Sequence, residues 1–438
     1  MPQSQSWYNY KGDLYICPRG NRERTREDGS DQTVLCSAPG SRYADKVAAL
    51  PYDVYNRAEA KKEVEREPLS FLAIDRAETQ FEDSVSVYAP EVYAKAKELF
   101  EERISQGIFI EDKQSAYYIY QLEMNGRTQT GIAACASVDD YLDGTIKKHE
   151  NTREEKEQDR IRHVDTLSAQ TGPIFLAYRS QAPINQLVSK IMETQEPLYD
   201  FTAADGIAHR MWKVTEEAVT TLQEAFAGIQ EIYIADGHHR AASAVKVGLK
   251  RRKEHPDYDG TEEFNYFLSV LFPDDQLMIM DYNRCVKDLH GLTKEAFLKA
   301  VEECFDVTVL DGAKHPQAKG QITMYLENRW YLLQAKQELL AITDPVAALD
   351  VSLLQEYLLK PVLGIEDPRT DERIDFIGGI RGLEELERRV QTDMTVAFAM
   401  YPTSIGELFA VADAGLLMPP KSTWFEPKLR SGLLMHRI

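Results

Sequence analysis

The stretch Glu231-Ile-Tyr-Ile-Ala-Asp-Gly-His-His-Arg240, followed by Ala241-Ala-Ser-Ala-Val-Lys-Val-Gly-Leu-Lys250, decides how this chain is interpreted. The apolar run 232–235 is typical of a buried strand, whereas the Ala-rich segment from Ala241 favours a helix. The pattern therefore predicts a strand-to-helix turn at Asp236-Gly237. The free N–H groups and the positive dipole end at the start of a helix attract anions, and Gly237 lets backbone and ligand approach closely. A phosphate group suits such a turn.

A purely structural explanation of this turn is that Asp236 caps the helix and that the two histidines are surface residues. Capping needs only the first residue of Asp-Gly-His-His-Arg. The five residues also bring together two imidazoles and a guanidinium, which suit an anionic ligand. We therefore favour a functional site at residues 236–240.

Length, composition and charge restrict the classes of protein to which this chain can belong. The 438 residues, 43% of them hydrophobic, predict two to three domains with real cores. No apolar run approaches the roughly 18 residues of a membrane span, and the N-terminus lacks the pattern of a signal peptide, so we expect a cytoplasmic protein without a membrane partner. Five scattered cysteines without a C-x-x-C pair indicate reduced thiols. The net charge of -20 argues against nucleic acid as a partner, because affinity for phosphate backbones needs a basic face.

The order of strand-like and helix-like segments predicts a mixed α/β (α+β) fold. Residues 1–40 are polar and predict an N-terminal arm. Residues 41–290 and 291–438 are predicted as two domains, the second an α/β domain with a closing loop at 418–428. Residues 90–105 predict a helix, and Asn125-Gly126 predicts a hairpin turn between strands at 117–123 and 130–138. The runs 48–55 and 70–74 predict strands, and 264–272 with 277–280 predict neighbouring strands of one sheet.

A second polar segment precedes the central motif. Thr152 and Glu155 form a capping-box pattern, which places His149 and Glu150 just outside the N-terminus of a helix. Further along that predicted helix a row of basic residues shares one face and is suited to an anion: Lys156, Arg160 and His163. The alternative is a solvated, salt-bridged helix, because acidic residues interleave with this row.

Absent motifs narrow the enzyme classes. The sequence contains no G-x-x-x-x-G-K-[ST] for a P-loop, and no G-x-G-x-x-G follows a predicted strand. Neither H-E-x-x-H nor a Cys/His zinc spacing occurs, so a tight transition-metal site is not expected. A nucleophile elbow, G-x-S-x-G, is also missing.

The chain resembles the bacterial and archaeal family catalogued as domain of unknown function 1015. The matching segments run in order from about residue 41 to the C-terminus: Ala49-Leu-Pro-Tyr-Asp-Val54, Ser70-Phe-Leu72, His149-Glu150-x-Thr152, Lys156-Glu157-x-Asp159-Arg160, Asp236-Gly-His-His-Arg240, Tyr282-Asn-Arg284, Asp375-Phe-Ile-Gly-Gly379 and Met418-Pro-Pro-Lys-Ser-Thr423. More distantly, the central motif is similar to the phosphate-binding turn of the ParB/sulfiredoxin fold. The free-serine kinases of that fold also carry a His-Glu pair upstream. The resemblance implies a ParB/sulfiredoxin-like core with large insertions.

This distant resemblance implies a small-molecule kinase. The implied acceptor is free L-serine, and the implied donor is ATP, ADP or pyrophosphate. Because phosphoryl transfer needs a base and positive charge around the transferring group, we assign catalytic roles to Glu150 as the base, to Asp236 and to His239. Asp236 is also the expected ligand of Mg²⁺, directly or through water, because a hard cation prefers carboxylate oxygen.

The remaining predicted site residues bind phosphate or nucleotide: Thr152, Gly237, His238, Arg240, Lys421, Ser422 and Thr423. The last three, with Lys428, are expected to close over the donor, because lysines and hydroxyls suit phosphate and the neighbouring prolines stiffen the loop. A C-terminal strap that only packs is the alternative for this loop. For the whole protein, the alternative function is a nucleotide-binding regulator or adaptor of the ParB type, without turnover.

Overall fold

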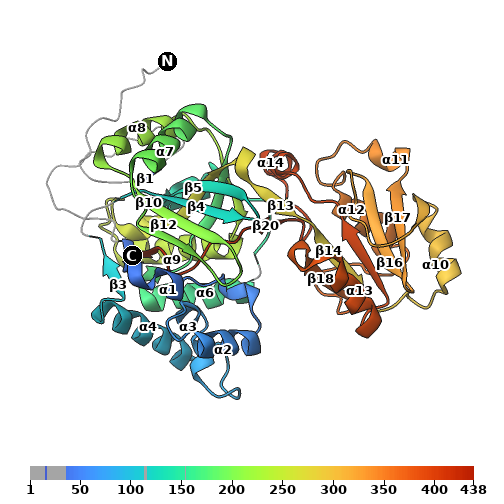
Figure 1. Ribbon diagram of the computed structural model, residues 1–438, viewed down its shortest axis with the longest axis horizontal. Coiled ribbons are helices and arrows are strands. Elements are labelled where there is room, and N and C mark those ends of the chain that lie inside the picture. Colours follow the sequence, from blue (N-terminus) through green and yellow to red (C-terminus); the bar gives the residue numbers. More distant parts are fainter. Residues whose placement is uncertain (1–14, 17–35, 113–115, 153) are drawn as a thin grey trace. The chain divides into compact units, whose positions relative to one another are not determined.

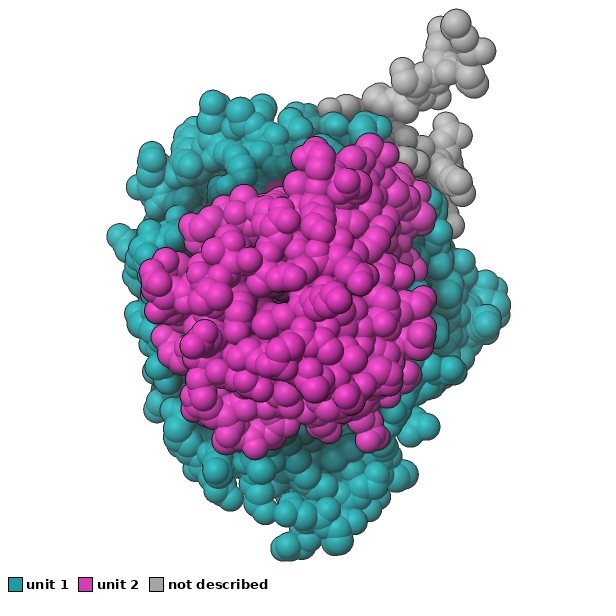
Figure 2. All heavy atoms as spheres, turned by 90° about the vertical axis from the view of Figure 1, so that its right-hand side faces the viewer, with its two compact units in different colours: residues 1–277, 427–438 teal, residues 278–426 magenta. Residues whose placement is uncertain are grey.

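The computed structural model describes residues 15–16, 36–112, 116–152 and 154–438, so most of the predicted arm at 1–40 lies outside the described residues. The chain divides into two compact units, 1–277 with 427–438, and 278–426, which Figure 2 distinguishes by colour. The second unit thus begins at Met278 rather than at 291, and the C-terminal residues return to the first unit. Residues 427–438 belong to the first unit because strand β21 (Met435–Arg437) pairs with its strands β2 and β7.

The first unit is built on a mixed nine-stranded sheet in the order β6-β11-β8-β12-β5-β4-β10-β9, with β1 added beside β5. A smaller sheet has the order β3-β2-β21-β7. The other strands of this unit are β1 (Tyr15–Ile16), β2 (Cys36–Pro39), β3 (Phe109–Glu111), β4 (Tyr118–Met124), β5 (Arg127–Ser137), β6 (Ile146–Lys147), β7 (Ala169–Gln170), β8 (Ile174–Tyr178), β9 (Tyr199–Thr202), β10 (Ala208–Lys213), β11 (Ile232–Asp236) and β12 (Tyr266–Pro273).

Helices pack around this sheet, and α6 and α9 lie side by side (Figure 1). The helices are α1 (Ala44–Val47), α2 (Arg57–Arg66), α3 (Leu72–Asp75), α4 (Pro90–Ser105), α5 (Val138–Leu142), α6 (Glu154–Leu167), α7 (Ala182–Thr194), α8 (Glu216–Ala227) and α9 (His238–Glu254). Short 3₁₀ turns are η1 (Ser41–Tyr43), η2 (Tyr52–Val54), η3 (Ala77–Gln80), η4 (Glu263–Asn265) and η5 (Asp274–Gln276). Within the described residues, no helix combines the length and apolarity needed to cross a bilayer.

Alternating apolar residues fix the sheet against its helices. Ile232 and Ile234 of β11 share a buried core with Ala241 and Val245 of α9. The same core includes residues of α7 and α8. This packing holds the end of β11 and the beginning of α9 in a defined place, which is where the central motif lies.

Local signals predicted several elements correctly. The Asn125-Gly126 hairpin is present, because both residues have the positive φ values, 54° and 76°, that a tight hairpin turn needs. Helix α4 spans the predicted 90–105 and begins with Pro90 in its first turn, where its missing N–H costs no bond. The predicted strand-helix order around Asp236-Gly237 is also confirmed.

Two strand predictions and one prediction of strand pairing are wrong. The run 70–74 is buried throughout, and its residues from Leu72 form the one-turn helix α3. In the run 48–55, Pro51 precedes the 3₁₀ turn η2. Strand β13 (Met278–Met280) pairs with β20 (Trp424–Glu426) rather than with β12, so 264–272 and 277–280 do not neighbour each other in one sheet.

The second unit is also mixed in composition, with a six-stranded antiparallel sheet in the order β15-β17-β16-β19-β14-β18. Its strands are β14 (Tyr282–Val286), β15 (Phe305–Leu310), β16 (Gln321–Leu326), β17 (Arg329–Ala335), β18 (Ile374–Gly378) and β19 (Val396–Met400). Its helices are α10 (Lys294–Val301), α11 (Gln337–Leu340), α12 (Asp350–Leu354), α13 (Gly382–Thr392) and α14 (Ile405–Asp413), with a π-turn at Gln355–Leu359 and a 3₁₀ turn at Gly379–Arg381. The mixed α/β class is therefore confirmed for both units.

Candidate functional site

The site is organised by the turn between β11 and α9. Gly237 occupies the N-cap of α9 with φ 93° and ψ 33°, a left-handed conformation that residues with a Cβ rarely adopt. Its carbonyl accepts the first helical bond from Ala241 N at 2.9 Å, and no side chain caps the helix there. The N-terminus of a 17-residue helix therefore keeps backbone N–H groups for a ligand.

Positive charge gathers beside this turn. The Asp236 carboxylate lies 3.3 Å from Arg240 Nη2 and 3.5 Å from Lys428 Nζ. Burial opposes ionisation of Asp236, but the charges of Lys428 and Arg240 hold its pKa well below the usual range. Asp236 is therefore a carboxylate at all ordinary pH values, and its role in this arrangement is to fix two cations at the start of α9.

Arg240 is anchored from two sides. Its Nη1 donates to the Pro173 carbonyl, and its Nη2 donates to Asp236. A Cβ at Gly237 would come within 3.0 Å of the guanidinium, so the glycine also gives this side chain its space. The guanidinium is thus held close against the backbone of the turn.

The upstream pair His149-Glu150 reaches the same turn. Glu150 Oε2 lies 3.8 Å from His238 Nδ1, and the His149 and His238 rings pack edge to face with centroids 4.4 Å apart. The two histidines are buried, whereas the Glu150 side chain is 37% exposed. The structure therefore brings together the carboxylate and the motif that the sequence placed far apart.

Both histidines are neutral near pH 7. Burial lowers the pKa of His149 to about 4, although the charge of Asp236 acts in the opposite direction. Burial also lowers the pKa of His238 well below its usual value, and His149 adds to the effect. Because a neutral imidazole carries no charge, His238 is not one of the cations of a phosphate cradle.

The hydrogen bonds assign a tautomer to His238. The His149 backbone N–H donates to His238 Nε2 at 3.5 Å, so this ring nitrogen is an acceptor. A neutral ring then carries its proton on Nδ1, which faces Glu150. On the His149 ring, Nδ1 is a buried nitrogen without a hydrogen-bond partner among the described residues. Buried polar atoms in native proteins nearly always have partners, so this nitrogen is available to a ligand or a water molecule.

Thr152 and His239 lie beside the turn with other partners. The Thr152 hydroxyl donates to Glu157 Oε2 at 2.6 Å, which leaves only its acceptor capacity for a ligand. Phosphate oxygens need donors, so this arrangement does not favour Thr152 as a phosphate ligand. His239 is half-buried at the second position of α9, and its backbone carbonyl accepts a hydrogen bond from the Ser243 hydroxyl at 2.7 Å. The roles assigned to Thr152 and His239 stay predictions.

The residues at the turn do not fit a protein-built Mg²⁺ site. The Asp236 carboxylate already faces two cations, which would repel a metal ion placed beside it. Across the described residues, no cluster of three or more histidine, cysteine or acidic side chains could hold a metal ion. We therefore derive no step through Mg²⁺.

The residues predicted to close over the donor belong to two different units. Lys421, Ser422 and Thr423 belong to the second unit, where the Ser422 hydroxyl donates to the Pro419 carbonyl at 2.6 Å. Closure of these three residues over the donor stays a prediction. Lys428 belongs to the first unit and contacts Asp236. Its position follows from the return of the C-terminal segment to the first unit, for which the local sequence carries no signal.

Two cavities of the first unit are lined by residues of α6, and one of them also reaches α9. The smaller, about 30 Å³, is lined by Arg240 and Ser243 of α9 among others. The larger is about 180 Å³. Four residues line both cavities: Tyr52, Asp75, Arg160 and His163. Sequence reasoning missed Asp75, because it lies at the end of a run that was interpreted as a strand.

The comparisons with known proteins give one family and several distant structures. The model of a family described as a protein of unknown function (DUF1015) matches residues 36–352. No curated protein matches the chain. A mutant free serine kinase in complex with AMP aligns at 14% identity with a TM-score of 0.35, covering 68% of this chain and 92% of that chain.

Two further structures align at similar values. C-terminally truncated SbnI from Staphylococcus aureus has 11% identity and a TM-score of 0.37, covering 68% of this chain and 85% of that chain. A conserved hypothetical protein from Pyrococcus furiosus has 15% identity and a TM-score of 0.33, covering 69% of this chain and 93% of that chain. At these values the likeness does not extend to individual residues, so function rests on the site itself.

Proposed function

This chain belongs to the DUF1015 family, and from that premise and the geometry of the β11–α9 turn we propose that the protein is a small-molecule phosphotransferase. The observation that carries the proposal is the approach of Glu150 to within 3.8 Å of His238 Nδ1, at the start of a helix whose N-cap has no capping side chain. A carboxylate beside an anion-binding helix terminus is what transfer of a phosphoryl group to a hydroxyl requires.

Glu150 is the base in this proposal. The acceptor hydroxyl oxygen forms a bond to the terminal phosphorus of the donor, the bond between that phosphorus and its bridging oxygen breaks, and the hydroxyl proton passes to the Glu150 carboxylate. The shortened phosphate chain leaves with the electron pair of the broken bond. His238 is a positioning residue, because its Nδ1–H faces the carboxylate and orients it.

The phosphate cradle consists of the α9 N–H groups and Arg240. The guanidinium is a permanent positive charge at the turn, and Asp236 contacts both it and Lys428. Charge that develops on the transferring group is stabilised best by donors that are already fixed before the reaction. The anchoring of Arg240 by Pro173 and Asp236 supports this role.

The proposed donor is ATP, ADP or pyrophosphate, and the proposed acceptor is a free hydroxyl, with L-serine as the first candidate. These identities follow from the resemblance of His149-Glu150 and Asp236-Gly-His-His-Arg240 to the motifs of free-serine kinases. The net charge of -20 adds a constraint, because an anionic donor has to be attracted by a local cluster against the field of the whole protein.

A donor-by-acceptor screen tests the proposal. The full-length protein is incubated with labelled ATP, ADP or pyrophosphate and with a panel of small hydroxyl compounds that includes L-serine, in the presence and absence of Mg²⁺. The expected result is a phosphorylated product whose yield depends on the acceptor. Tight binding of a nucleotide without any product in the whole panel would favour the ParB-type regulator and contradict the transferase.

A further inference from the structure

The larger cavity of the first unit is a second candidate binding site, separate from the phosphate cradle. Its volume of about 180 Å³ is below the range of about 300–1,000 Å³ typical of sites for drug-sized ligands. It has room for several water molecules or for one small metabolite. Its walls come from η2, α3, η3, α4 and α6. The lining is mostly polar, and its charged members are Asp53, Asp75, Arg76, Glu78, Lys156, Asp159 and Arg160.

Most of these charges already have partners in the cavity wall. Arg76 donates to the carbonyls of Tyr52 and Tyr55, at 3.0 and 2.6 Å, and pairs with Glu78. Arg160 contacts Asp159 at 2.7 Å. These contacts make the wall a fixed arrangement rather than a set of mobile surface side chains.

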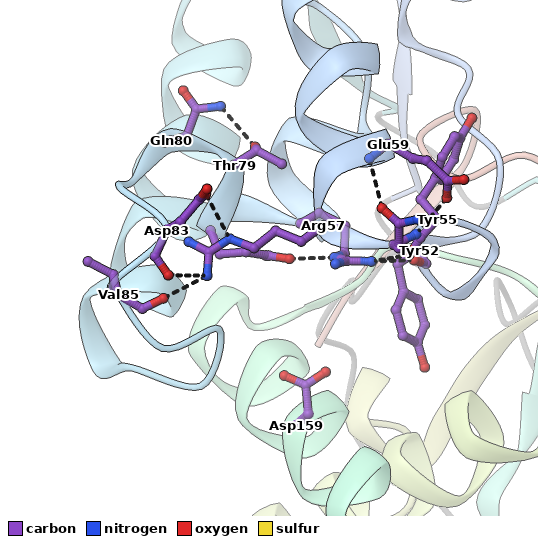
Figure 3. Close-up of polar contacts among 12 residues, drawn as sticks. Tyr52, Tyr55, Arg57, Glu59, Thr79, Gln80, Asp83, Val85 and Asp159 are labelled. Atoms are coloured by element: carbon purple, nitrogen blue, oxygen red, sulfur yellow. Dashed lines mark hydrogen bonds and ion pairs between the residues drawn. The ribbon is translucent and has the colours of Figure 1, made fainter. Parts of the chain in front are cut away.

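Asp159 contacts two other residues of the cavity lining. Besides its contact with Arg160, it accepts a hydrogen bond from the Tyr93 hydroxyl at 2.8 Å. Figure 3 shows its carboxylate projecting from α6 toward the layer that carries Tyr52 and Tyr55. The Arg160 guanidinium lies over the Tyr52 ring, 4.0 Å from its centroid, so η2 and α6 are held together across the cavity.

Two charged lining residues of opposite sign are not part of the contacts described above. Asp53 on η2 and Lys156 on α6 both line the cavity and are both exposed. Within the described part of the chain, neither side chain takes part in an ion pair. One acid and one base outside the ion pairs of the described residues, in a cavity of this size, are complementary to a small molecule that carries one charge of each sign.

The row of basic residues on α6 forms part of the lining of this cavity. Lys156, Arg160 and His163 all line the cavity, as a helical face at i, i+4 and i+7 allows. The Arg160 charge is compensated by Asp159, and His163 Nε2 lies 3.4 Å from Asp75. The cationic face is therefore largely neutralised, and Lys156 is its remaining basic group.

The cavity also leads toward the phosphate cradle. Tyr52, Asp75, Arg160 and His163 line both the larger cavity and the smaller one, and Arg240 lines the smaller one. The two cavities are therefore adjacent, and an acceptor in the larger one would lie beside the cavity that Arg240 lines.

We propose that the larger cavity is the acceptor site and that it recognises a small zwitterion, an amino acid with a hydroxyl, through Asp53 on the ammonium group and Lys156 on the carboxylate. The role of the bound molecule as acceptor rests on the proposed function, but binding of a zwitterion can be measured without any transfer reaction. Asp53 and Lys156 act here as binding residues and take no part in the chemistry.

Calorimetric titration of the full-length protein without donor tests the proposal. The probes are L-serine, L-alanine, which has the same charges without the hydroxyl, and the singly charged ethanolamine and glycolate. We expect both amino acids to bind and the singly charged compounds to bind at least about tenfold more weakly, because each lacks one of the two ion pairs.

Variants assign the binding to this cavity. Lys156→Gln and Asp53→Asn should each weaken L-serine binding about tenfold. Lys97→Gln, at an exposed position of α4 outside the cavity, should leave the affinity unchanged. Because Asp53 and Lys156 are exposed, their replacement should not alter folding, which thermal unfolding checks. Equal L-serine affinity of wild type and Lys156→Gln would overturn the proposal, as would the absence of binding by any amino acid.

A titration with pyrophosphate separates this inference from the proposed function. Lys156→Gln should keep the pyrophosphate affinity of the wild type, whereas Arg240→Ala should lose it. Turnover with a different acceptor and no amino-acid binding would overturn the zwitterion site and leave the transferase standing. Amino-acid binding that depends on Lys156, with no transfer from any donor, would support the site and contradict the transferase.

Discussion

The Glu150 carboxylate and the His238 imidazole approach to 3.8 Å, although they lie on segments far apart in the chain. Glu150 follows strand β6, and His238 begins helix α9 after strand β11. β6 and β11 are parallel neighbours in the sheet, so their C-terminal ends open at the same edge. The pairing of these two strands is therefore what delivers a carboxylate to the N-terminus of α9.

Replacement of Glu150 by glutamine should lower kcat by about 10²–10⁴, because the amide keeps the shape of the side chain but cannot accept the acceptor proton. Donor affinity, measured by calorimetry, should change little. Glu154→Gln, at an exposed position in the first turn of α6, is the matched control and should retain activity. Near-normal turnover of Glu150→Gln in the presence of a folded protein would remove Glu150 as the base.

Arg240→Ala should weaken pyrophosphate and nucleotide binding by about tenfold or more, because charge-assisted bonds from a guanidinium to phosphate contribute roughly 1.5–3 kcal/mol. Arg162→Ala, at an exposed position of α6, is the control for loss of one positive charge. Since Arg240 also holds the Pro173 carbonyl, thermal unfolding should be measured in parallel. Equal affinities of the two variants would show that the phosphate binds elsewhere.

Asp236 should make the stability of the first unit sensitive to acid. Its pKa lies below the usual range in the folded state, where burial is outweighed by Lys428 and Arg240. The unfolded chain therefore takes up the proton first, so the contribution of Asp236 is present above about pH 4 and is lost as the pH falls below it. Denaturant titrations at about pH 7 and pH 3 should show the difference between wild type and Asp236→Asn shrinking in acid.

The exposed Asp83 is the control for this measurement, since its side chain is 81% exposed. Asp83→Asn should change the free energy of unfolding by less than about 0.5 kcal/mol at either pH. A difference between wild type and Asp236→Asn that stays constant over the same range would mean that the ion pairs with Lys428 and Arg240 do not stabilise the fold.

His149 predicts a second loss of stability on acidification, which begins at a higher pH than the loss from Asp236. Burial lowers its pKa to about 4 in the folded state, against about 6.5 in the unfolded chain, so the unfolded state binds more protons between these values. The contribution is fully present above about pH 6.5 and decreases as the pH falls toward 4. Between pH 7 and pH 5 it should amount to about 2 kcal/mol, which His149→Asn removes from the pH dependence.

Denaturant unfolding at the two pH values measures this effect, with His315→Asn at an exposed position as the control. The control should leave the pH dependence of the wild type unchanged. If His149→Asn also leaves it unchanged, His149 is not held neutral by burial and the assignment of the neutral tautomers at the site has to be revised.

Local sequence signals predicted those elements whose geometry is fixed by adjacent residues. Asn125-Gly126 set a hairpin because both residues tolerate a positive φ, and Gly237 set the turn before α9 for the same reason. The run 70–74 was misinterpreted because a short, fully buried segment is apolar whether it is helical or extended. Burial of such a run reports its place in the core and not its backbone conformation.

The sequence by itself determined the strand-to-helix turn, since Asp236-Gly-His-His-Arg240 carries the strand end, the positive φ and the first helical turn in five consecutive residues. Only the tertiary structure decided which groups surround it. Glu150 arrives through the pairing of β6 with β11, and Lys428 arrives through the return of the C-terminal segment to the first unit. The neutral state of His238 is likewise a tertiary property, because burial lowers its pKa and burial depends on packing between segments distant in the chain.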